Sequence, residues 1–529
     1  MSNPLDDLEL PDVLFCIGTN MTECHPVAAT RLMRALDKGA RLIVADPRHI
    51  RLAERAHLVL PLRVGTDVAL LSAMAHVIVR DGLVNQEFIA QRTQGYEQLA
   101  EHLRPMTPQW AQQITGVRAA DIEQAARWYA QAKDGAIYYT LGITEHQAGV
   151  DNVQSLCNLA LLTGHIGRHG TGINPLRGQN NVQGAGDMGA VPTSFPGYQK
   201  VGDDAARARF EQAYGRKLPN VKGPTKVGAM ELALEGKLKA MLIDGENTLQ
   251  TDENRTLTEQ ALANLDHLVV IDIFPSETTK LAHVVLPASS WGETDGTCVN
   301  TERRVQRLRR AVAPQGEARP DWWIVCQIAQ RLGFRGFDFA GPHEIFAEVA
   351  GLSPIYKGLT WERVDEAIQW PVPEAGHPGT EVLHEGTFIN GRGLFQRVTF
   401  KEPPEVVNAH YPLWLTTGRR LQSYHSHTMT GRSAGIDKLL AGETLEMHPA
   451  DLVTYGLRDG GRCRVTSPRG SLIMQVAATD RSPRGTVFTS FAFADTPVNV
   501  LTGSGHDPVT ETSEMKVSIV RVEPVDGSG

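Results

Sequence analysis

The chain has 529 residues, of which 41% are hydrophobic and 21% charged, with a formal net charge of −8 at pH 7. This length exceeds what one hydrophobic core serves, so three or four domains are expected, and the modest negative charge argues against a nucleic-acid partner. No run approaches the ~20 consecutive apolar residues of a membrane span, and the acidic start of the chain, the reverse of a secretory signal, makes the cytoplasm the expected location.

The first predicted elements are short apolar runs at residues 13–17, 42–46 and 56–61, with a helical stretch between the first two. Such alternation is typical of parallel βαβ units. Gly18 follows the first run and Asp46 closes the second. In parallel sheets, ligands bind at the carboxyl ends of the strands. There a glycine lets the backbone approach a phosphate, and an aspartate accepts hydrogen bonds from a ribose or base.

Residues 163–189 form a long run rich in Gly, Asn and Gln, with almost no apolar periodicity. A loop of this length without a function is uncommon in a compact domain. We therefore expect it to wrap around a polar ligand.

The pattern of the first elements then recurs, with apolar runs at 240–244, 268–272 and 282–287. Gly245 precedes Asp272 by 27 positions, as Gly18 precedes Asp46 by 28, and an Ala-His pair begins ten positions after each aspartate. Neither copy carries a GxGxxG fingerprint, which argues against NAD or FAD. Two interpretations stay open: two half-sites that bind two similar nucleotide-bearing molecules, or a duplicated scaffold in which one site does not bind.

The last part of the chain changes in character. A less regular connector marked by prolines precedes strands with tight turns, such as 462–466 and 472–476, which favour a β-barrel with a helix near 449–452 packed across it. The predicted fold class is α/β with this barrel at the C-terminus. The predicted division is a first α/β unit at 1–190, a second at 191–345, a connector at 346–407 and the barrel at 408–529.

The run from Thr163 to Gly189 closely resembles the signature of the formate dehydrogenase branch of the molybdopterin oxidoreductases. Shorter stretches extend this resemblance over nearly the whole chain: Asp46-Pro47-Arg48, Gly65-Thr66-Asp67, Trp291-Gly292-Glu293 and Asn300-Thr301-Glu302-Arg303-Arg304. The resemblance implies two Rossmann-like units related by the internal repeat and a C-terminal double-psi β-barrel. It also implies a cofactor made of two molybdopterin guanine dinucleotides around one molybdenum or tungsten ion.

The resemblance further implies which residues bind this cofactor. One dinucleotide pocket comprises Gly18, Asn20, Glu23, Asp46, Arg48, Gly65 and Asp67. The other comprises Gly245, Asn247, Thr251 and Asp272. The C-terminal part resembles a lid over both, with Arg419, Ser423, Tyr424, Asn499 and Lys516. Arginine and lysine suit a pyrophosphate, while asparagine and serine suit the edges of pterin and guanine.

Arg177 resembles the arginine that faces the metal and orients the carboxylate of formate. A guanidinium holds a carboxylate with two parallel hydrogen bonds and keeps its charge. The implied reaction is oxidation of formate to carbon dioxide, with the metal centre supplying the redox chemistry. The alternatives are a nitrate reductase-like enzyme of the same family and a non-catalytic module that holds the bis-molybdopterin guanine dinucleotide.

The six cysteines show neither a CxxC pair nor the spacing of an iron–sulfur site: Cys16, Cys24, Cys157, Cys298, Cys326 and Cys463. The family has an upstream segment with a 4Fe-4S cluster and the Cys or selenocysteine that binds the metal, and this sequence has no counterpart of it. We therefore expect those groups in a preceding segment of a longer gene product or in a partner chain.

The expected partners are formate and an electron-transfer subunit, and whether this chain alone is active stays open. No metal ligand is assigned within it. His425 and His427 are expected to lie in a polar loop near the cofactors rather than to bind a metal. Adjacent Cys24 and His25 are not expected to form a nucleophile and base, because neighbouring residues rarely place both side chains productively.

Overall fold

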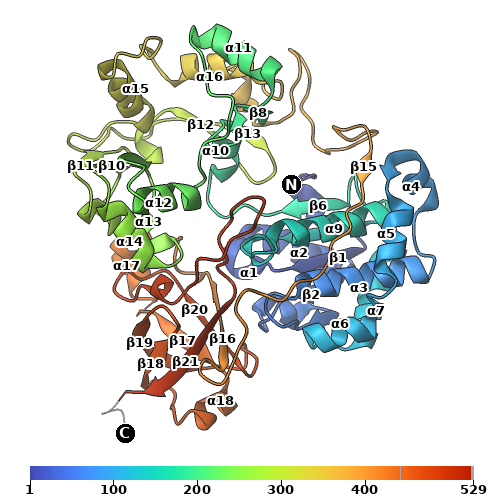
Figure 1. The fold of residues 1–529 in the computed structure, drawn as a ribbon. Helices are drawn as coiled ribbons and strands as arrows, with labels where there is room; N and C mark the ends of the chain where they lie inside the picture. The colour runs from blue at the N-terminus through green and yellow to red at the C-terminus, as the bar shows by residue number, and fades with distance from the viewer. Residues whose placement is uncertain (441, 526–529) are drawn as a thin grey trace. The chain divides into compact units, whose positions relative to one another are not determined.

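The computed structural model describes residues 1–440 and 442–525, which divide into two compact units (Figure 1). Unit one comprises Met1–Leu176, Gln250–Thr256 and Val382–Gly529, and unit two comprises Arg177–Leu249 and Leu257–Glu381. Two helices cross the sequence boundaries of the units, α13 (Thr248–Thr251) and α14 (Arg255–Ala263).

A five-stranded parallel sheet forms the centre of unit one, in the order β3-β2-β1-β5-β6. Its alternate residues enter two different cores. Phe15 and Ile17 join one core, while Leu14 and Cys16 join the core on the opposite face, as expected for a parallel sheet covered on both sides. The strands are β1 (Val13–Ile17), β2 (Arg41–Ala45), β3 (Leu58–Leu60), β5 (Gly135–Tyr139) and β6 (Gly172–Pro175).

Helices cover both faces of this sheet. α2 (Pro26–Asp37) packs on the face of Leu14, and α3 (Asp67–Arg80), α7 (Ala119–Gln131) and α9 (Gly149–Thr163) pack on the other. The smaller elements are η1 (Leu5–Glu9), α1 (Met21–Cys24), η2 (Arg51–Arg55), α4 (Gln86–Arg92), α5 (Tyr96–Leu103), α6 (Pro108–Thr115) and α8 (Leu141–Thr144), with β4 (Thr93–Gln94) paired to β15 (Gly393–Leu394).

The C-terminal part of unit one is a closed six-stranded barrel in the order β16-β20-β17-β19-β18-β21. It is mixed, because β16 pairs with β20 and β17 with β19 in parallel, while the other pairs are antiparallel. Its strands are β16 (Leu413–Gly418), β17 (Thr444–Met447), β18 (Arg462–Thr466), β19 (Ser471–Ala478), β20 (Thr486–Ser490) and β21 (Ser518–Pro524). Short helices join them: η6 (Thr430–Arg432), α17 (Ala434–Asp437), α18 (Pro449–Thr454) and η7 (Val498–Val500).

Unit two contains a parallel sheet in the order β11-β10-β9 and an antiparallel sheet in the order β12-β13-β14. Their strands are β9 (Ala240–Asp244), β10 (His267–Asp272), β11 (Val284–Pro287), β12 (Gly296–Val299), β13 (Arg304–Leu308) and β14 (Ile368–Gln369). The other elements are α10 (Val182–Asp187), β7 (Ser194–Phe195), β8 (Gln199–Lys200), α11 (Asp204–Tyr214), α12 (Lys226–Leu234), η3 (Thr278–Lys280), η4 (Trp291–Glu293), α15 (Asp321–Arg331), α16 (Pro342–Leu352) and η5 (Arg363–Glu366).

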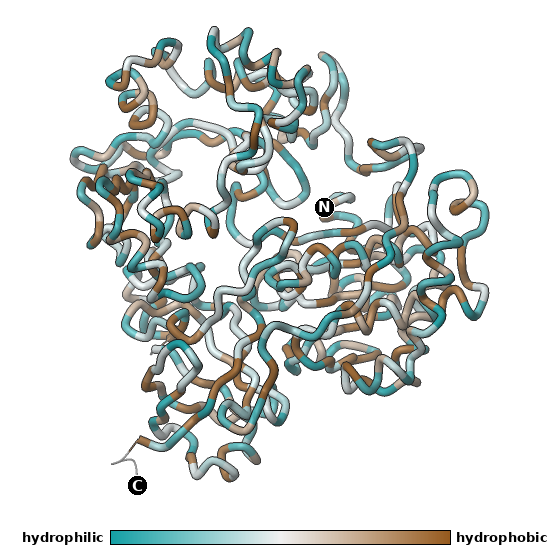
Figure 2. The backbone as a smooth tube through the Cα atoms, viewed as in Figure 1, coloured by the Kyte–Doolittle hydropathy of each residue, from teal (hydrophilic) through white to brown (hydrophobic). Residues whose placement is uncertain are grey.

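The predicted α/β class with parallel sheets and a C-terminal barrel is confirmed. Hydrophobic stretches of the chain coincide with the sheets and the barrel strands, and hydrophilic stretches with many of the connections (Figure 2). Within the described part of the chain, no helix combines the length and the apolar character needed to cross a membrane.

Candidate functional site

The carboxyl end of β1 approaches the carboxyl end of β5 closely at Gly18. Gly18 has a φ of +55°, and a Cβ there would lie 2.7 Å from the carbonyl carbon of Gly142. Its carbonyl accepts hydrogen bonds from the Thr140 hydroxyl at 2.8 Å and the Gly142 amide at 3.2 Å. Only glycine suits both this backbone conformation and this spacing. Asn20, two residues on, is the N-cap position of α1.

Asp46 lies directly after β2, beside this end of β1. Its Oδ1 accepts a hydrogen bond from the Arg48 amide at 2.9 Å, which turns the chain sharply out of the sheet. Burial raises the pKa of Asp46 to about 6. An ionised carboxylate is therefore costly here unless a ligand donates hydrogen bonds to it.

Arg48 joins the α/β part of unit one to the barrel. It forms a buried ion pair with Glu446 of β17, and its guanidinium carbon lies 3.3 Å from the ring centroid of Phe488 in β20. A second arginine, Arg420, reaches the other oxygen of Glu446 at 3.3 Å. Glu446 therefore forms ion pairs with two arginines, a role that its sequence context did not reveal.

A second cluster of charges connects the residues that follow α8 with the C-terminal segment. His146 Nδ1 lies 3.2 Å from a carboxylate oxygen of Glu514, and the Lys516 ammonium lies 2.7 Å from Glu145. Burial lowers the pKa of His146, but Glu514 and Asp67 outweigh this effect and raise it to about 9. The imidazole is therefore charged at neutral pH. Burial also raises the pKa of Asp67, the first residue of α3.

These charges converge around α1. Burial raises the pKa of the Cys24 thiol to about 11, and Arg419 and Lys516 oppose that shift while Glu23 and Asp46 add to it. Four predicted site residues therefore lie near the half-buried Cys24 thiol. Glu23 is also held by Arg481, whose guanidinium donates to it at 2.6 Å. A thiol with a raised pKa is not activated, which argues against Cys24 as a nucleophile.

Gly65 approaches the segment before the barrel. It has a φ of +74°, and a Cβ there would lie 2.6 Å from the ring of Pro403. The predicted residues of the first pocket are thus distributed over the carboxyl ends of β1 and β2 and the start of α3, with Arg419 and Lys516 supplied from beyond β16 and before β21.

A second group of predicted residues gathers around Gln250 in unit one. The Gln250 side chain donates to the carbonyls of Ser426, Phe491 and Ala492, and its own carbonyl accepts from the Asn499 amide at 3.0 Å. Ser423 and Tyr424 precede Ser426 in the same loop, where Ser423 Oγ contacts His427 Nδ1 at 3.1 Å. Thr251 follows Gln250 directly.

Unit two repeats the strand-end geometry of unit one. The Gly245 amide donates to the carbonyl of Ile271, as the Gly18 amide donates to that of Ala45. Ala45 and Ile271, the residues whose carbonyls accept these bonds, directly precede Asp46 and Asp272. The Oδ1 atom of each aspartate also accepts a hydrogen bond from the backbone amide two residues further along the chain. Burial raises the pKa of Asp272 as well.

The histidines of the two Ala-His pairs also make matching contacts. His57 Nδ1 accepts the Leu42 amide at 3.1 Å, and His283 Nδ1 accepts the Leu268 amide at 2.9 Å. Asn247 is buried, and its Oδ1 accepts from the amide and the hydroxyl of Thr278. Of the four residues predicted for the second pocket, Gly245, Asn247 and Asp272 belong to unit two, whereas Thr251 belongs to unit one.

Arg177 begins unit two, in the Gly- and Asn-rich run. Its amide donates to the Thr301 hydroxyl at 2.9 Å, and its Nε donates to Gln183 Oε1 at 3.1 Å. Asn181 accepts the Val299 amide at 3.0 Å, so the run is held on the β12–β13 hairpin at two points. The predicted loop contains a short helix, α10.

Several buried polar atoms of unit one have no hydrogen-bond partner among the described residues. They include Thr19 Oγ1 beside Gly18, Arg48 Nε beside Asp46, and Asn499 Oδ1. Burying such atoms without a partner is costly, and a polar ligand would offset that cost. The donors, acceptors and close-approach glycines present here therefore fit a large polar ligand with phosphate and base groups.

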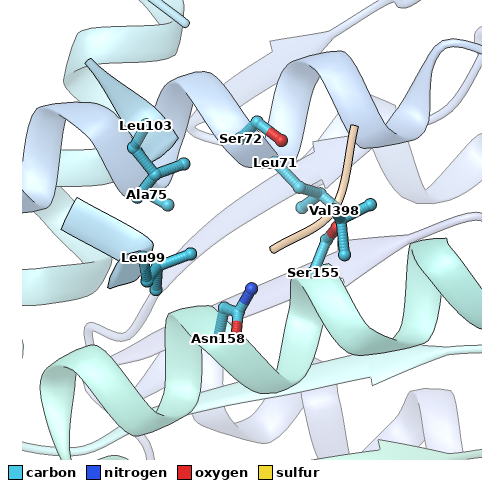
Figure 3. Close-up of a pocket in the computed structure, with 8 residues that line it drawn as sticks. All are labelled: Leu71, Ser72, Ala75, Leu99, Leu103, Ser155, Asn158 and Val398. Carbon is cyan, nitrogen blue, oxygen red and sulfur yellow. The ribbon is translucent and has the colours of Figure 1, made fainter. Parts of the chain in front are cut away.

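No group of three His, Cys, Asp or Glu side chains able to hold a metal ion occurs in the described ranges. A cavity of about 10 Å³ lies between α3, α5 and α9, with Ser72, Ser155 and Asn158 as its polar lining (Figure 3). It has room for about one water molecule, which is too little for a substrate.

Comparison with known proteins places the chain in a family. Residues 1–331 match the molybdopterin oxidoreductase family, and residues 413–519 match the molybdopterin dinucleotide binding domain. A formate dehydrogenase subunit alpha of Methanocaldococcus jannaschii is 42% identical, over 99% of this chain and 78% of its own length. Formate dehydrogenase H of Escherichia coli is 37% identical, over 99% and 74%. The chain belongs to the molybdopterin oxidoreductase family.

Two further similarities bear on function and fold. The assimilatory nitrate reductase catalytic subunit of Bacillus subtilis is 34% identical, over 99% of this chain and 76% of its own length. The solved structure of acetylene hydratase from Pelobacter acetylenicus superposes with a TM-score of 0.78 at 21% identity, covering 99% of this chain and 79% of that one. The second similarity concerns the fold alone.

Proposed function

We propose that the chain is the catalytic subunit of a formate dehydrogenase, which oxidises formate to carbon dioxide, one proton and two electrons. The observation that carries the proposal is Arg177, held by Thr301 and Gln183 within the glycine- and asparagine-rich run. A fixed guanidinium with two parallel donors suits a small carboxylate. The identity of 42% with a formate dehydrogenase subunit alpha supports the same substrate.

The proposed cofactor is a bis-molybdopterin guanine dinucleotide with molybdenum or tungsten. When bound, its metal would supply the redox chemistry. The first dinucleotide would be held by Gly18, Asn20, Glu23, Asp46, Arg48, Gly65 and Asp67, and the second by Gly245, Asn247, Thr251 and Asp272. Arg419, Ser423, Tyr424, Asn499 and Lys516 would complete both pockets. The unpartnered buried atoms of Thr19, Arg48 and Asn499 support this assignment.

The finer architecture follows from the same proposal. The matching glycine, aspartate and histidine contacts of the two parallel sheets support two Rossmann-like halves related by an internal repeat. The mixed six-stranded barrel supports a double-psi topology. We retain 1–190, 191–345, 346–407 and 408–529 as the proposed functional segments. The 4Fe-4S cluster would lie in a preceding segment of a longer gene product or in a partner chain, and an electron-transfer subunit is the proposed partner.

Each residue has a separate task in the proposed reaction. Arg177 binds the carboxylate of formate and so fixes the direction in which the C–H bond points. Gln183 limits the rotation of the Arg177 side chain. The charged cluster of His146, Glu514 and Lys516 holds the C-terminal segment against the residues that follow α8.

Replacing Asp46 with asparagine is expected to stabilise the cofactor-free protein while weakening cofactor retention. The pKa of Asp46 is raised to about 6, so ionising this carboxyl destabilises the folded state increasingly as the pH rises from about 4 to about 6. Asp46→Asn removes that cost but keeps the acceptor for the Arg48 amide. We expect Tm to rise by about 1–3 °C at pH 7.5, with a smaller gain at pH 5.

Calorimetry of the cofactor-free protein at the two pH values measures the first effect. The pterin content of protein purified from a cofactor-producing host measures the second. Asp37→Asn is the matched control, because Asp37 is exposed and lies outside the pocket. A loss of stability together with normal pterin content would contradict the role given to Asp46.

A substrate assay tests the proposed function. The protein, purified with its bound cofactor and partners, is given formate with an oxidised viologen dye or nitrate with the reduced dye. Formate-dependent dye reduction is the expected result. Nitrate reduction alone would favour the second candidate, which the similarity of 34% to a nitrate reductase keeps open. Full cofactor content with neither reaction would favour a non-catalytic binding module.

A further inference from the structure

Gln183 of α10 connects Arg177 to the buried carboxylate of Asp187, which belongs to the same helix. Gln183 Oε1 accepts the Nε–H of Arg177 at 3.1 Å, and Gln183 Nε2 donates to Asp187 Oδ1 at 2.8 Å. Gln183 is 4% exposed and Asp187 is 0% exposed. All of these residues belong to unit two, so the connection lies inside one compact unit.

The carboxylate of Asp187 fixes which way the Gln183 amide points. An ionised carboxylate only accepts hydrogen bonds, so the amide must present its NH₂ group to Asp187. Tyr198 Oη, 2.9 Å from Gln183 Nε2, accepts from the same group. The carbonyl oxygen of Gln183 is thereby turned toward Arg177. A flipped amide would place an NH₂ group against the Nε–H, which is a contact between two donors.

Asp187 is itself held firmly. The hydroxyls of Tyr198 and Tyr356 donate to its two oxygens, at 2.8 Å and 2.7 Å. Tyr356 is fully buried in a hydrophobic core formed around β13 and α16. Burial raises the pKa of Asp187, and the hydrogen bonds that it accepts oppose this shift by favouring the ionised form. The orientation of Gln183 is therefore set by the core of unit two rather than by a surface loop.

We propose that Gln183 is a positioning residue for the Arg177 guanidinium and that Asp187 acts through it by fixing its amide. Occupying Nε fixes the plane of the guanidinium, and so the direction in which it presents its donors to a planar carboxylate. The identity of that carboxylate as formate rests on the proposed function. The geometric connection between the three side chains does not.

The glycine- and asparagine-rich run is also held in place by hydrogen bonds that do not involve Gln183 or Asp187. Arg177 donates its amide to Thr301, and Asn181 accepts the Val299 amide. A change at Gln183 should therefore remove a hydrogen bond of the Arg177 side chain while the loop keeps its place. This separation makes the proposal testable by a side-chain measurement.

The test measures hydrogen exchange at the Nε–H of Arg177 by NMR, in full-length protein with ¹⁵N-labelled arginine. Arg177→Lys identifies the signal by its loss. In the unaltered protein the Nε–H is expected to exchange at least about fivefold more slowly than in free arginine, as one hydrogen bond of ordinary net strength would give. Exchange as fast as in free arginine would overturn the proposal without any further variant.

Two variants extend the test. Gln183→Met keeps the size of the side chain but removes its acceptor, and Asp187→Asn allows the Gln183 amide to flip. Each is expected to accelerate exchange about fivefold, and the double variant no more than either alone. Gln260→Met, at an exposed position of α14, is the matched control and should change nothing. Unchanged exchange in a folded Gln183→Met variant would overturn the proposal.

Kinetics separate this inference from the proposed function. In the cofactor-loaded enzyme, Gln183→Met is expected to raise KM for formate about fivefold with a smaller effect on kcat, because the loosened guanidinium mainly weakens carboxylate binding. If the NMR result holds while formate is not oxidised, the positioning role stands and the substrate assignment fails. If the NMR result fails, the positioning role is wrong whatever the enzyme oxidises.

Discussion

Replacing Arg177 with alanine is expected to lower kcat/KM for formate oxidation by about a thousandfold, because it removes the charged, bidentate partner of the carboxylate. Arg177→Lys keeps the positive charge but not the planar pair of donors. We expect it to retain more activity than the alanine variant and to remain well below the unaltered enzyme. Both values come from initial rates with formate and an oxidised viologen dye.

Cofactor content must be measured in the same preparations, since a loss of cofactor would also lower the rate. Arg309→Ala is the matched control: this arginine also belongs to unit two and forms an exposed ion pair with Asp365. It should change the rate less than twofold, in line with the small energies of surface ion pairs. An Arg177→Ala variant with full cofactor content and near-normal formate oxidation would refute the role assigned to Arg177.

Replacing Glu446 with alanine is expected to cause the largest loss of stability, about 3–5 kcal/mol. The substitution leaves the buried guanidinium of Arg48 without its counter-ion and also removes a contact of Arg420. Breaking a buried pair by deleting one partner costs more than the pair contributes, because the remaining charge is left without solvent. For a unit of this size we expect a fall in Tm of about 5–10 °C.

Thermal unfolding followed by circular dichroism measures this change. Glu101→Ala is the control, because Glu101 forms an ion pair with Arg104 in which both side chains are more than half exposed. That variant should hardly shift Tm. A Glu446→Ala protein as stable as the control would show that the Arg48–Glu446 pair does not anchor the α/β part of unit one to the barrel.

The local elements of the fold could be predicted well from the sequence. The apolar runs at 13–17 and 240–244 coincide with β1 and β9. β1 is buried throughout, as expected for an uninterrupted hydrophobic strand covered on both faces, whereas Ile243 is the one buried residue of β9. The recurrence of glycine, aspartate and the Ala-His pair was also informative. Each of these residues makes an equivalent backbone contact in the two sheets.

The long-range contacts of the candidate site could not be predicted in the same way. Arg48 and Glu446 are 398 positions apart, and their pairing depends on how the barrel packs against the first sheet. No strand is predicted around Glu446, and its role as a counter-ion has no signal in the sequence. Gln183 and Asp187 appeared only as polar residues of a loop, because a four-residue helical spacing is easily missed among glycines.

The guanine nucleotide content of the purified protein tests the central claim most directly. Acid hydrolysis of protein from a cofactor-producing host releases GMP from each bound dinucleotide, and chromatography gives the amount per chain. Two pockets with equivalent strand-end geometry predict two GMP per chain, together with one molybdenum or tungsten ion. One GMP per chain would mean that the repeated geometry of unit two does not bind a dinucleotide, and none would contradict the assignment of both pockets.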